Sequence, residues 1–508
     1  SLAEEGDIDT LVSWMHHLPA STDPSRIDLQ INLAWALAHY FRFDESRQLL
    51  DNLDQMVVNH RDDIAPNAWL KLRVVRAICE AFAEKIPESL AIVEPLLAKV
   101  PCGDTWVDGL ICNILSYCHV VNQRYTDALE VQRHMPCPES PLDNLFVSVY
   151  RAFIIAQCHL GQGDLENAWG HAENALRQAE RYTGPQSTSG ATLAPLLAEM
   201  AYERKNLDSL NTLLADRLEF IDRFGPPDAL SRCYTYLARQ ALNDDMPHEA
   251  ERLLEHAQRL AVSRGWQRPQ ALLLAEQARV RLQRANYPGA EQLQRQLEQL
   301  AARATIDAEN PCQRAIAQYA IVSRSRLLLA SGQAPQASLL LGELVTEQER
   351  RGDRLSAARL RTLWSLSLWN SGENAAAVAA LQPAQQLAAQ QHLKRIFLDA
   401  GDALQPLLVR VRETSAASEG DALWPGKGSQ SEGKRIQREN LDVNLDLSER
   451  EQQILQLIAD GQMNKEIARS LAISAETVKW HIKNIYAKLK VNSRTQAMSR
   501  ALEMKLLD

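Results

Sequence analysis

A repeat with a period near 40 residues constrains the fold of this chain more than any other feature of its sequence. Through residues 1 to about 413, a turn that contains Gly, Asn, Asp or Pro precedes a small residue within an apolar stretch. Each unit begins with a helical pattern of apolar residues three and four apart, such as Leu33, Leu37 and Tyr40, and ends with a second helical pattern. One helical hairpin cannot bury its apolar face alone, so neighbouring hairpins must stack. The sequence therefore predicts an all-α solenoid.

The small residues set the register of this repeat. They are separated by 36, 43, 39, 40, 41, 41, 40, 47 and 39 residues, at Thr10, Ser46, Ser89, Ala128, Ala168, Ser209, Ala250, Ala290, Ala337 and Ala376. We expect each to lie where two helices approach closely. The register resembles tetratricopeptide (TPR) repeats, although the period exceeds their usual length of about 34 residues. We therefore predict a TPR-like superhelix over residues 1–413. Because Thr10 already belongs to a second helix, we expect the sequence to be a fragment that starts inside a repeat.

Composition excludes several classes of protein. A length of 508 residues exceeds what one hydrophobic core organises, which agrees with an elongated array. No apolar run reaches the roughly 18 residues that a membrane span requires, and there is no secretory signal. The eight cysteines are scattered without a Cys-x-x-Cys pair, which is typical of reduced thiols in a cytoplasm. We therefore predict a cytoplasmic protein that does not bind membranes.

No motif predicts catalysis in this chain. Residues 420–427, GDALWPGK, resemble a phosphate-binding loop, but five residues separate the glycines and neither Ser nor Thr follows the lysine. Cys118-His119 and Cys158-His159 lie 40 residues apart, at equivalent places in adjacent hairpins. These pairs are compatible with a metal site, but buried structural cysteines are the favoured interpretation. We predict no catalytic residue, no metal site and no cofactor in this chain.

Aromatic residues in the repeats raise a further hypothesis, a ligand site on the concave face of the solenoid. The same side chains can instead pack between hairpins, and this is the favoured interpretation. The residues concerned are Trp69, Trp106, Tyr117, Tyr150, Tyr234 and Tyr236. The sequence therefore nominates no particular inducer-binding residue.

Helical periodicity is lost over residues 414–440, where Ser, Gly, Glu and Lys dominate. Such a composition is typical of a flexible linker. We therefore predict a tether between the solenoid and a separate C-terminal domain at residues 441–508.

The C-terminal domain has the start and stop signals of a helix-turn-helix. Ser448 and Glu451 form a capping box that begins a first helix, and Gly461 supplies its left-handed end. Asn464 caps a short second helix that continues to Leu471. The sequence therefore predicts two short helices before the helix that follows the turn.

A third helix is predicted from Ala475 to about Leu489, capped by Ser474. Only two residues separate this cap from the second helix, and so tight a turn crosses two helices at a steep angle. Its apolar residues form one narrow face that we expect to pack on the first two helices: Val478, Ile482, Ile485 and Leu489.

The opposite face of the third helix is charged and carries one tryptophan. Trp480 and Lys483 point away from the apolar face, and Lys479 lies on its flank. An ordinary solvated face explains the charges but explains Trp480 poorly. Residues 461–508 hold nine Lys and Arg against four Asp and Glu, so they carry +5 while the other 460 residues carry −14. This asymmetry is typical of a phosphate-binding module on an acidic body and predicts DNA binding.

The same residues resemble the LuxR-type (NarL/GerE-type) DNA-binding domain. The match includes Leu447-Ser448, Arg450-Glu451, Asn464-Lys465-Glu466-Ile467-Ala468, Ile473-Ser474, Thr477-Val478-Lys479, His481, Asn484-Ile485, Lys488-Leu489, Val491 and Arg494. In that family the outward residues of the third helix contact bases in the major groove, which implies this role for Lys479, Trp480 and Lys483. Phosphate contacts from the second helix and the turn are implied for Asn464, Lys465, Ser474 and Thr477.

A fourth helix, Ser493 to about Leu506, completes the domain by the same resemblance. It mediates pairing on DNA in that family, which implies dimerisation through Ala497, Ala501 and Leu502. The resemblance therefore implies a four-helix domain that binds double-stranded promoter DNA.

The order of helical repeats, linker and LuxR-type domain resembles the MalT-type regulators, the large ATP-dependent branch of the LuxR family. This resemblance implies an ATPase module before the repeats, outside this sequence, with ATP as its cofactor. It also implies that the repeats recognise a small-molecule inducer or a regulatory protein and drive self-association into an oligomer. We therefore expect an inducer-responsive transcription activator that acts with RNA polymerase, and no enzyme in this chain.

One alternative function stays open. The solenoid could be a protein-interaction scaffold whose helix-turn-helix has been reused for dimerisation. Binding to duplex DNA that weakens steeply with salt would separate the regulator from the scaffold.

Overall fold

The computed structural model describes residues 26–59, 67–135, 144–304, 310–414 and 449–471, and, after these, residues 478, 481, 482, 485, 486, 489, 491, 494–503 and 506. All of the regular structure in this part of the chain is helical, and none of these residues lies in a strand. The predicted all-α fold is thereby confirmed. Among the described helices, none combines the length and apolar character needed to cross a bilayer.

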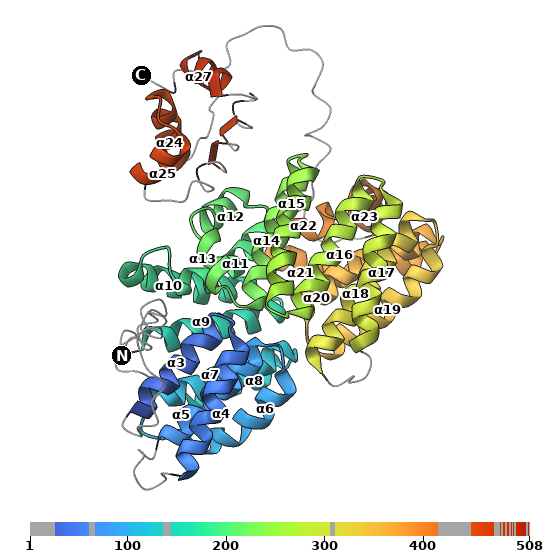
Figure 1. Ribbon diagram of the computed structural model, residues 1–508. Helices are drawn as coiled ribbons and strands as arrows, with labels where there is room; N and C mark the ends of the chain where they lie inside the picture. The colour runs from blue at the N-terminus through green and yellow to red at the C-terminus, as the bar shows by residue number, and fades with distance from the viewer. Residues whose placement is uncertain are drawn as a thin grey trace. The chain divides into compact units, whose positions relative to one another are not determined.

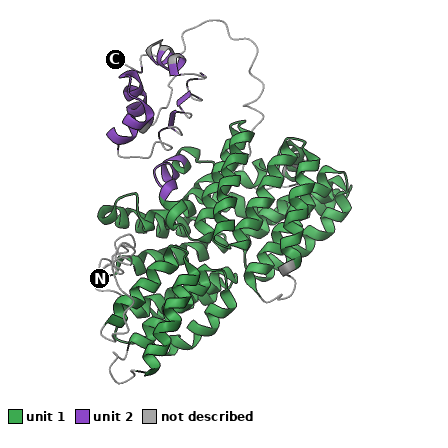
Figure 2. Ribbon diagram, in the orientation of Figure 1, with its two compact units in different colours: residues 1–210, 220–423 green, residues 211–219, 424–508 purple. Residues whose placement is uncertain are grey.

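The chain divides into two compact units (Figure 2). The first comprises residues 1–210 and 220–423, and the second comprises residues 211–219 and 424–508. The predicted linker falls, apart from its first residue, in a stretch outside the described residues. The boundaries assigned to the linker therefore stay predictions.

The repeat region is an array of helical hairpins (Figure 1). Its first half comprises α3 (Ile27–His39), α4 (Phe43–Asn59), α5 (Ala68–Phe82), α6 (Ile86–Val93), the 3-10 helix η2 (Glu94–Lys99), α7 (Thr105–Val121), α8 (Tyr125–His134), α9 (Leu145–Gly161), α10 (Leu165–Thr183), α11 (Thr188–Glu203), α12 (Leu207–Leu214) and α13 (Leu218–Phe224). Its second half comprises α14 (Pro227–Asn243), α15 (Pro247–Ser263), α16 (Gln267–Gln283), α17 (Tyr287–Ala304), α18 (Pro311–Ala330), α19 (Ala334–Arg350), α20 (Arg354–Asn370), α21 (Asn374–Gln391), α22 (Arg395–Leu398), the 3-10 helix η3 (Asp402–Leu404) and α23 (Gln405–Thr414).

The hairpin turns share one backbone conformation. A residue with positive φ ends the first helix, at Phe41, Glu84, Gln123, Gly163, Lys205, Asp245, Ala285, Gly332 and Gly372. The next amide bonds back across the turn, as Arg42 N does to the Leu37 carbonyl at 3.0 Å, which is the Schellman arrangement. Five positions after each left-handed residue stands a side chain with 0% exposure: Ser46, Ser89, Ala128, Ala168, Leu210, Ala250, Ala290, Ala337 and Ala377.

This register confirms most of the predicted small residues and corrects two. Ser209 is only partly buried and Ala376 is exposed, so both predictions were wrong by one position. Leu210 and Ala377 occupy the buried places instead. The sequence pattern could not settle these two units, because a small residue also stands next to the buried one in each case. Thr10 lies outside the described residues.

The close approach of the paired helices explains why small residues recur. The Ser46 hydroxyl donates a hydrogen bond to the Ala34 carbonyl at 2.9 Å, and Ser89 does the same to Ala77 at 2.8 Å. At most of these positions a small side chain lets the two backbones approach closely, and Leu210 is the one larger residue in the set. The buried hydroxyls are satisfied by the facing helix, as buried polar groups must be.

The array curls until segments distant in sequence touch. The Trp266 indole N–H donates to the Phe82 carbonyl at 2.8 Å, across 184 positions. The Gln123 amide donates to Asp353 Oδ2 at 2.8 Å, across 230 positions. These contacts lie within the first unit and enclose part of the axis of the superhelix.

The second unit contains α24 (Glu449–Ala459), α25 (Asn464–Ser470) and α27 (Arg494–Glu503). Between α25 and α27, six described residues are helical, at 478, 481, 482, 485, 486 and 489. The predicted helix from Ala475 to Leu489 is therefore confirmed at these positions, and its other residues lie outside the description.

A buried histidine stands in the aromatic core of the first repeats. The His39 ring lies 4.3 Å from that of Trp35, 5.1 Å from Phe82 and 5.2 Å from Phe146, between ring centroids. Its Nδ1–H donates to the Trp35 carbonyl at 2.8 Å. Burial lowers the pKa of His39 to about 4, against a smaller opposing effect of that hydrogen bond. The folded protein therefore holds this imidazole neutral.

We predict that His39 makes the repeats acid-sensitive. Because its folded pKa is lowered from 6.5 to about 4, stability is present above pH 6.5 and is lost as the pH falls towards 4. Between pH 7 and pH 4.5 the loss from this residue should be about 2–3 kcal/mol. Urea unfolding of His39→Gln at both pH values should show a correspondingly smaller loss than the wild type. An identical loss in both proteins would contradict the prediction.

Candidate nucleic-acid interface and superhelical cavity

One apolar core holds the C-terminal helices of the second unit together. It comprises Ile454, Leu455, Ile458, Ile467, Ala468, Val478, Ile482, Ile485, Leu489, Ala497 and Ala501. The four apolar residues predicted to form the inward face of the third helix all belong to it, with exposed fractions of 8% or less. The predicted inward face is therefore confirmed. This core sets the helical phase of the segment predicted to bind DNA.

One of the helix ends predicted for the second unit is confirmed, and one is wrong. Gly461, at φ +82°, ends the first helix, and the next amide bonds back to Leu457 at 3.1 Å. The predicted helix cap at Asn464 is wrong by one residue, because α25 begins at Asn464 itself. The Met463 amide donates to the Glu466 carboxylate at 2.7 Å, so Glu466 satisfies the donor that precedes the helix. Ser448 lies outside the described residues.

Arg494 has a structural role that the sequence pattern did not reveal. From the start of α27, its Nη2 donates to the Ile458 carbonyl at 3.1 Å and to the Gln462 carbonyl at 2.7 Å. The last carbonyls of a helix have no partner within the helix. Arg494 therefore binds the end of α24 to α27 through charge-assisted hydrogen bonds.

Most of the residues predicted to contact DNA lie outside the described part of the chain. These are Lys479, Trp480, Lys483, Ser474 and Thr477. Of the remaining two, Lys465 is exposed and Asn464 is partly buried, and both stand in the first turn of α25. Their contacts with DNA stay predictions.

Two of the predicted dimerisation residues lie in the core of the domain. Ala497 and Ala501 have 0% exposure, because their methyl groups fill the core of their own domain. They are therefore not available to a second copy in this conformation. Helical spacing places a small residue inward wherever helices pack closely, whether the partner helix is in the same chain or another. The side chain of Leu502 lies outside the description, and pairing through α27 stays a prediction.

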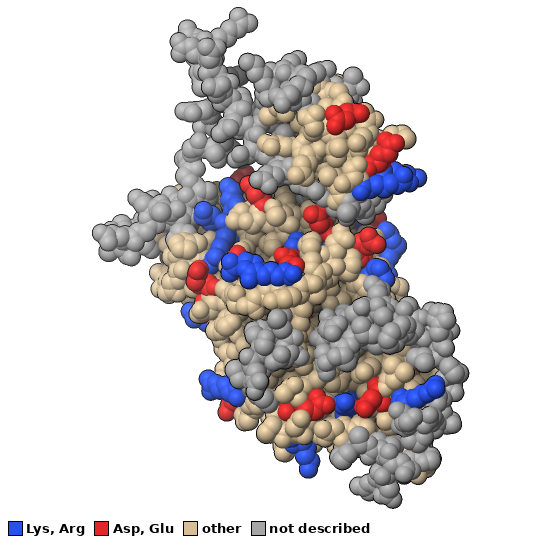
Figure 3. Space-filling view, turned by 90° about the vertical axis from the view of Figure 1, so that its left-hand side faces the viewer, with Lys and Arg blue, Asp and Glu red and all other residues tan. Residues whose placement is uncertain are grey.

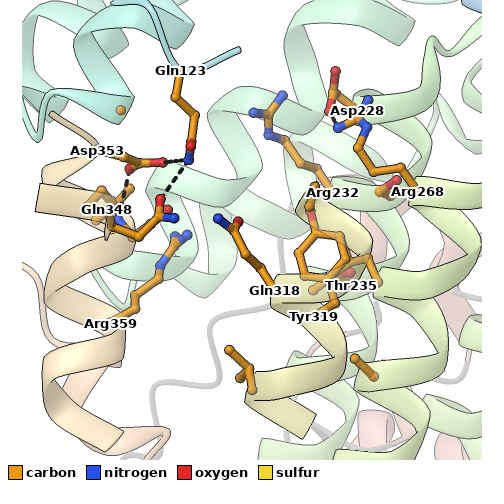
Figure 4. A pocket seen from close by; sticks show the side chains of 18 of the residues that line it. Gln123, Asp228, Arg232, Thr235, Arg268, Gln318, Tyr319, Gln348, Asp353 and Arg359 are labelled. Atoms are coloured by element: carbon orange, nitrogen blue, oxygen red, sulfur yellow. Dashed lines mark hydrogen bonds and ion pairs between the residues drawn. The ribbon is translucent and has the colours of Figure 1, made fainter. Parts of the chain in front are cut away.

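The first unit contains a cavity of about 380 Å³ on the axis of its superhelix. The lining comes from α7, α8, α9, α11, α14, α16, α18, α19 and α20, together with the turns that hold Gln123 and Asp353. Figure 4 shows Gln123, Gln348 and Asp353 grouped on one side, and Asp228, Arg232 and Arg268 on another. The curl of the array therefore brings side chains more than 200 positions apart to one site.

Paired charges dominate the wall formed by α14. Arg232 pairs with Glu199 at 2.7 Å, and Arg239 pairs with Glu276 at 2.6 Å. Residues four and seven positions apart share one face of a helix, so both arginines face the same way. On the surface shown in Figure 3, basic and acidic side chains are likewise interspersed. The pairing offsets the cost of placing charges where water is scarce.

Glu199 is the most heavily shared carboxylate of the cavity. Burial alone would raise its pKa, but Arg232 and Arg359 outweigh burial and lower the pKa to about 2. The Tyr236 hydroxyl donates to Glu199 Oε1 at 2.9 Å, and Arg359 Nη2 donates to the same oxygen at 2.8 Å. Glu199 thus holds α11, α14 and α20 together as an anion.

A second buried carboxylate, that of Asp353, forms no ion pair with any residue that the structure describes. Asp353 accepts hydrogen bonds from the Gln123 amide at 2.8 Å, the Tyr125 hydroxyl at 3.1 Å and the Ser356 amide at 3.1 Å. Burial, the largest effect, raises the pKa of Asp353 despite these bonds. The turn before α20 is therefore tied to the turn before α8 by polar contacts without an ion pair.

One face of α18 lines the cavity along the length of that helix. Arg314, Gln318, Tyr319, Val322 and Arg326 all belong to the lining. Arg314 donates to Asn122 Oδ1 at 3.4 Å. Neither Arg314 nor Arg326 forms an ion pair with any residue in the described ranges, unlike the arginines of α14.

The aromatic residues named from the sequence are mostly packing residues, as expected. Trp106, Tyr117 and Tyr234 are 5% exposed or less, whereas Trp69 is 43% exposed. Tyr236 is buried as well, but it lines the cavity. The sequence did not reveal this difference, because only the curl of the array decides which buried rings border the axis.

The two Cys-His pairs do not converge on a metal site. Cys118 and Cys158 are fully buried, and burial raises the pKa of each thiol to about 12. The Cys118 thiol donates to the Ser89 hydroxyl at 3.4 Å. Across the residues described, no group of three or more His, Cys, Asp or Glu side chains could hold a metal ion.

Two families match this chain. Residues 71–414 match the MalT-like TPR region, and residues 445–501 match the luxR family of bacterial regulatory proteins. The HTH-type transcriptional regulator AlkS of Alcanivorax borkumensis is 20% identical over 513 residues, which cover 98% of this chain and 56% of AlkS. The transcriptional regulatory protein LiaR of Bacillus subtilis is 46% identical over 87 residues, which cover 16% of this chain and 40% of LiaR. The chain thus spans about half the length of these relatives.

A solved structure shares the fold of the repeat region. The Rap protein complexed with Competence and Sporulation Factor superposes with a TM-score of 0.53 at 12% identity. The superposition covers 73% of this chain and 100% of the Rap chain. At this identity the likeness concerns the fold alone, and it confirms a TPR-like superhelix.

We predict that Glu199 stabilises the cavity wall. Glu199→Gln removes the charge shared by Arg232 and Arg359, so unfolding should become easier by roughly 3–5 kcal/mol. Because the pKa of Glu199 is lowered from 4.5 to about 2, this stabilisation is present above pH 4.5 and lost as the pH falls towards 2. Urea denaturation at pH 7 and pH 3 measures both effects.

The matched control is Glu45→Gln, which removes the partner of Arg42 from an exposed pair. Exposed pairs contribute about 1 kcal/mol or less, so this variant should unfold almost as the wild type does. Equal losses for the two variants would show that Glu199 acts as an ordinary surface charge.

Proposed function

Because this chain belongs to the MalT-like TPR family and carries a luxR-family DNA-binding domain, we propose that it is a transcription regulator. Its helix-turn-helix binds promoter DNA, and its superhelix senses a ligand that controls that binding. The core of the second unit supports the first half of this proposal most directly. It buries the inward face of the third helix, and the helical period of the sequence places Trp480 and Lys483 opposite that face.

The cavity of the superhelix supports the second half of the proposal. A volume of about 380 Å³ falls within the range of about 300–1,000 Å³ that is usual for small-molecule sites. Convergent polar groups and apolar residues line it together, as ligand sites require. We infer an inducer-responsive activator that associates with itself and with RNA polymerase and that, by its resemblance to the MalT-type regulators, depends on ATP.

The scaffold alternative requires a surface of the helix-turn-helix through which two copies can pair. A helix-turn-helix reused for pairing needs an exposed surface for a second copy, but two of the three residues nominated for pairing are buried in their own core. The regulator is therefore favoured, and DNA binding tests it directly.

We predict that Lys479 and Lys483 contribute to DNA binding. The double variant Lys479→Ala/Lys483→Ala should weaken binding to a promoter duplex by at least roughly 1–3 kcal/mol. Wild-type affinity should fall steeply as salt rises from 50 to 200 mM, because released counterions drive the binding. Fluorescence anisotropy across this salt range measures both quantities.

A double variant with the same change in charge serves as the control. Arg324→Ala/Lys394→Ala removes two exposed cations from the repeat region and should leave affinity unchanged. Unchanged affinity after loss of Lys479 and Lys483, or binding that ignores salt, would refute the regulator and favour the scaffold.

We also predict that Lys465 contacts a phosphate and no base. Lys465→Ala should weaken binding to promoter and random duplexes by the same factor and reduce the salt slope by about 1. Lys483→Ala should instead reduce the preference for the promoter. Loss of sequence preference in Lys465→Ala, with an unchanged salt slope, would contradict this division of roles.

A further inference from the structure

The cavity of the first unit carries more positive than negative charge. Six arginines line it, Arg232, Arg239, Arg268, Arg314, Arg326 and Arg359, against the four carboxylates of Glu199, Asp228, Glu276 and Asp353. A cavity that shields charges from water should contain matched pairs. The excess of cations therefore needs an explanation.

Four of the six arginines are explained by ion pairs. Arg232 and Arg239, both on α14, form the ion pairs described above. Arg268 pairs with Asp228 at 2.5 Å, and Arg359 pairs with Glu203 at 2.7 Å. The excess is thus confined to α18, where Arg314 and Arg326 have no carboxylate partner among the described residues.

The carboxylates nearest to Arg326 already form ion pairs with other arginines. Glu276 already pairs with Arg239 at 2.6 Å and with Arg279 at 3.4 Å. Asp399 likewise lies 3.4 Å from Arg279 and 3.8 Å from Arg239. The nearest carboxylates are therefore committed to other arginines, and Arg326 adds a further cation to the same cluster.

Burial, followed by repulsion from Arg279, lowers the pKa of Arg326 to about 10. The guanidinium stays charged at neutral pH even so. A partly buried cation without a partner destabilises a fold, and such a cost is typical of a binding site that is incomplete without its ligand.

The rest of the α18 face is suited to an apolar body. Val322 stands one helical turn before Arg326, and Leu272, Leu360 and Leu363 also line the cavity. A guanidinium matches the planar geometry of a carboxylate or phosphate and can bind two of its oxygens. An anionic head and an apolar body therefore find complementary groups within one helical turn.

We propose that the cavity binds a small organic anion, whose carboxylate or phosphate group pairs with Arg326 and whose apolar part packs on Val322 and the leucines. The proposal rests on the sensor role proposed above and assigns the chemical class of the ligand. Arg314, 12 positions earlier on α18, offers a second cation about 18 Å along the helix. A longer ligand with two anionic groups can reach towards it.

The test measures thermal unfolding and titration calorimetry of the whole 508-residue chain with three probes. Benzoate and phenyl phosphate present the two anionic groups on one apolar body, and benzamide is the neutral counterpart. At least one anion should raise the unfolding midpoint with dose, while benzamide should not. Comparison of benzoate with phenyl phosphate decides which anionic group the site prefers.

Variants of α18 locate the site. Arg326→Gln should weaken binding of the anion about tenfold or more, and Arg326→Lys, which keeps the charge but loses the planar fork, should weaken it less. Arg324→Gln, an exposed arginine two positions away, is the control and should bind as the wild type does. Without ligand, Arg326→Gln should unfold at a higher temperature than the wild type, which also shows that it folds.

Several outcomes would overturn the proposal: no effect of either anion, equal effects of benzoate and benzamide, or equal binding by Arg326→Gln. DNA binding, measured with and without the anion, separates this inference from the proposed function. If anion binding depends on Arg326 but leaves DNA affinity unchanged, the proposed anion site is supported and the proposed sensor role is contradicted. Salt-dependent DNA binding without any anion binding would retain the regulator and remove the site.

Discussion

The close approach of two helices at one fully buried position, repeated in each hairpin, is the contact on which this fold depends. A left-handed residue reverses the chain five positions earlier, so the distance from turn to contact is constant. Residues other than glycine adopt this conformation at several turns, among them Phe41 and Ala285, at a local cost of about 1–2 kcal/mol each. The packing of the following helix must outweigh that cost. Turn geometry and packing therefore specify the same register, which makes it robust.

The regular contact between neighbours also determines where charge must be placed. A constant rotation per hairpin curls the array, and the curl encloses an axis lined by side chains from helices far apart in sequence. Arginine and carboxylate side chains such as Arg359 and Glu203 meet there across 156 positions. Because these pairs join helices far apart in sequence, each pair can form only at the native curvature of the array and therefore stabilises that curvature. A hairpin added or removed would leave several buried charges unpaired.

The sequence predicted the helices, the TPR-like array and the inward face of the third C-terminal helix, because these follow from local periodicity. It misplaced Ser209 and Ala376 by one position, since a neighbouring residue satisfied the same pattern. The cavity could not be predicted, because its existence depends on the accumulated rotation of many hairpins. In the sequence Arg326 does not differ from other arginines on amphipathic helices. Only the tertiary structure shows that it forms no ion pair with the described residues around it. Arg494 was part of the family signature, but its hydrogen bonds to the end of α24 follow only from the tertiary packing of α24 against α27.

The cavity lies where the curl closes, and this position bears on how a ligand could act. The turn that holds Gln123 meets Gln348 and Asp353 at its edge through hydrogen bonds of 2.7 and 2.8 Å. One of these hydrogen bonds joins two neutral side-chain amides, and the other joins an amide to a carboxylate that forms no ion pair among the described residues. They therefore resist opening less than the ion pairs of α14 do. A ligand that touches α18 and also the turn that holds Gln123, both of which line the cavity, contacts both sides of this junction. It can bind one curvature of the array better than another, and a difference in affinity between two states is the physical requirement for a ligand to shift their populations. Curvature of the superhelix is therefore the property through which binding in the cavity can be transmitted along the array.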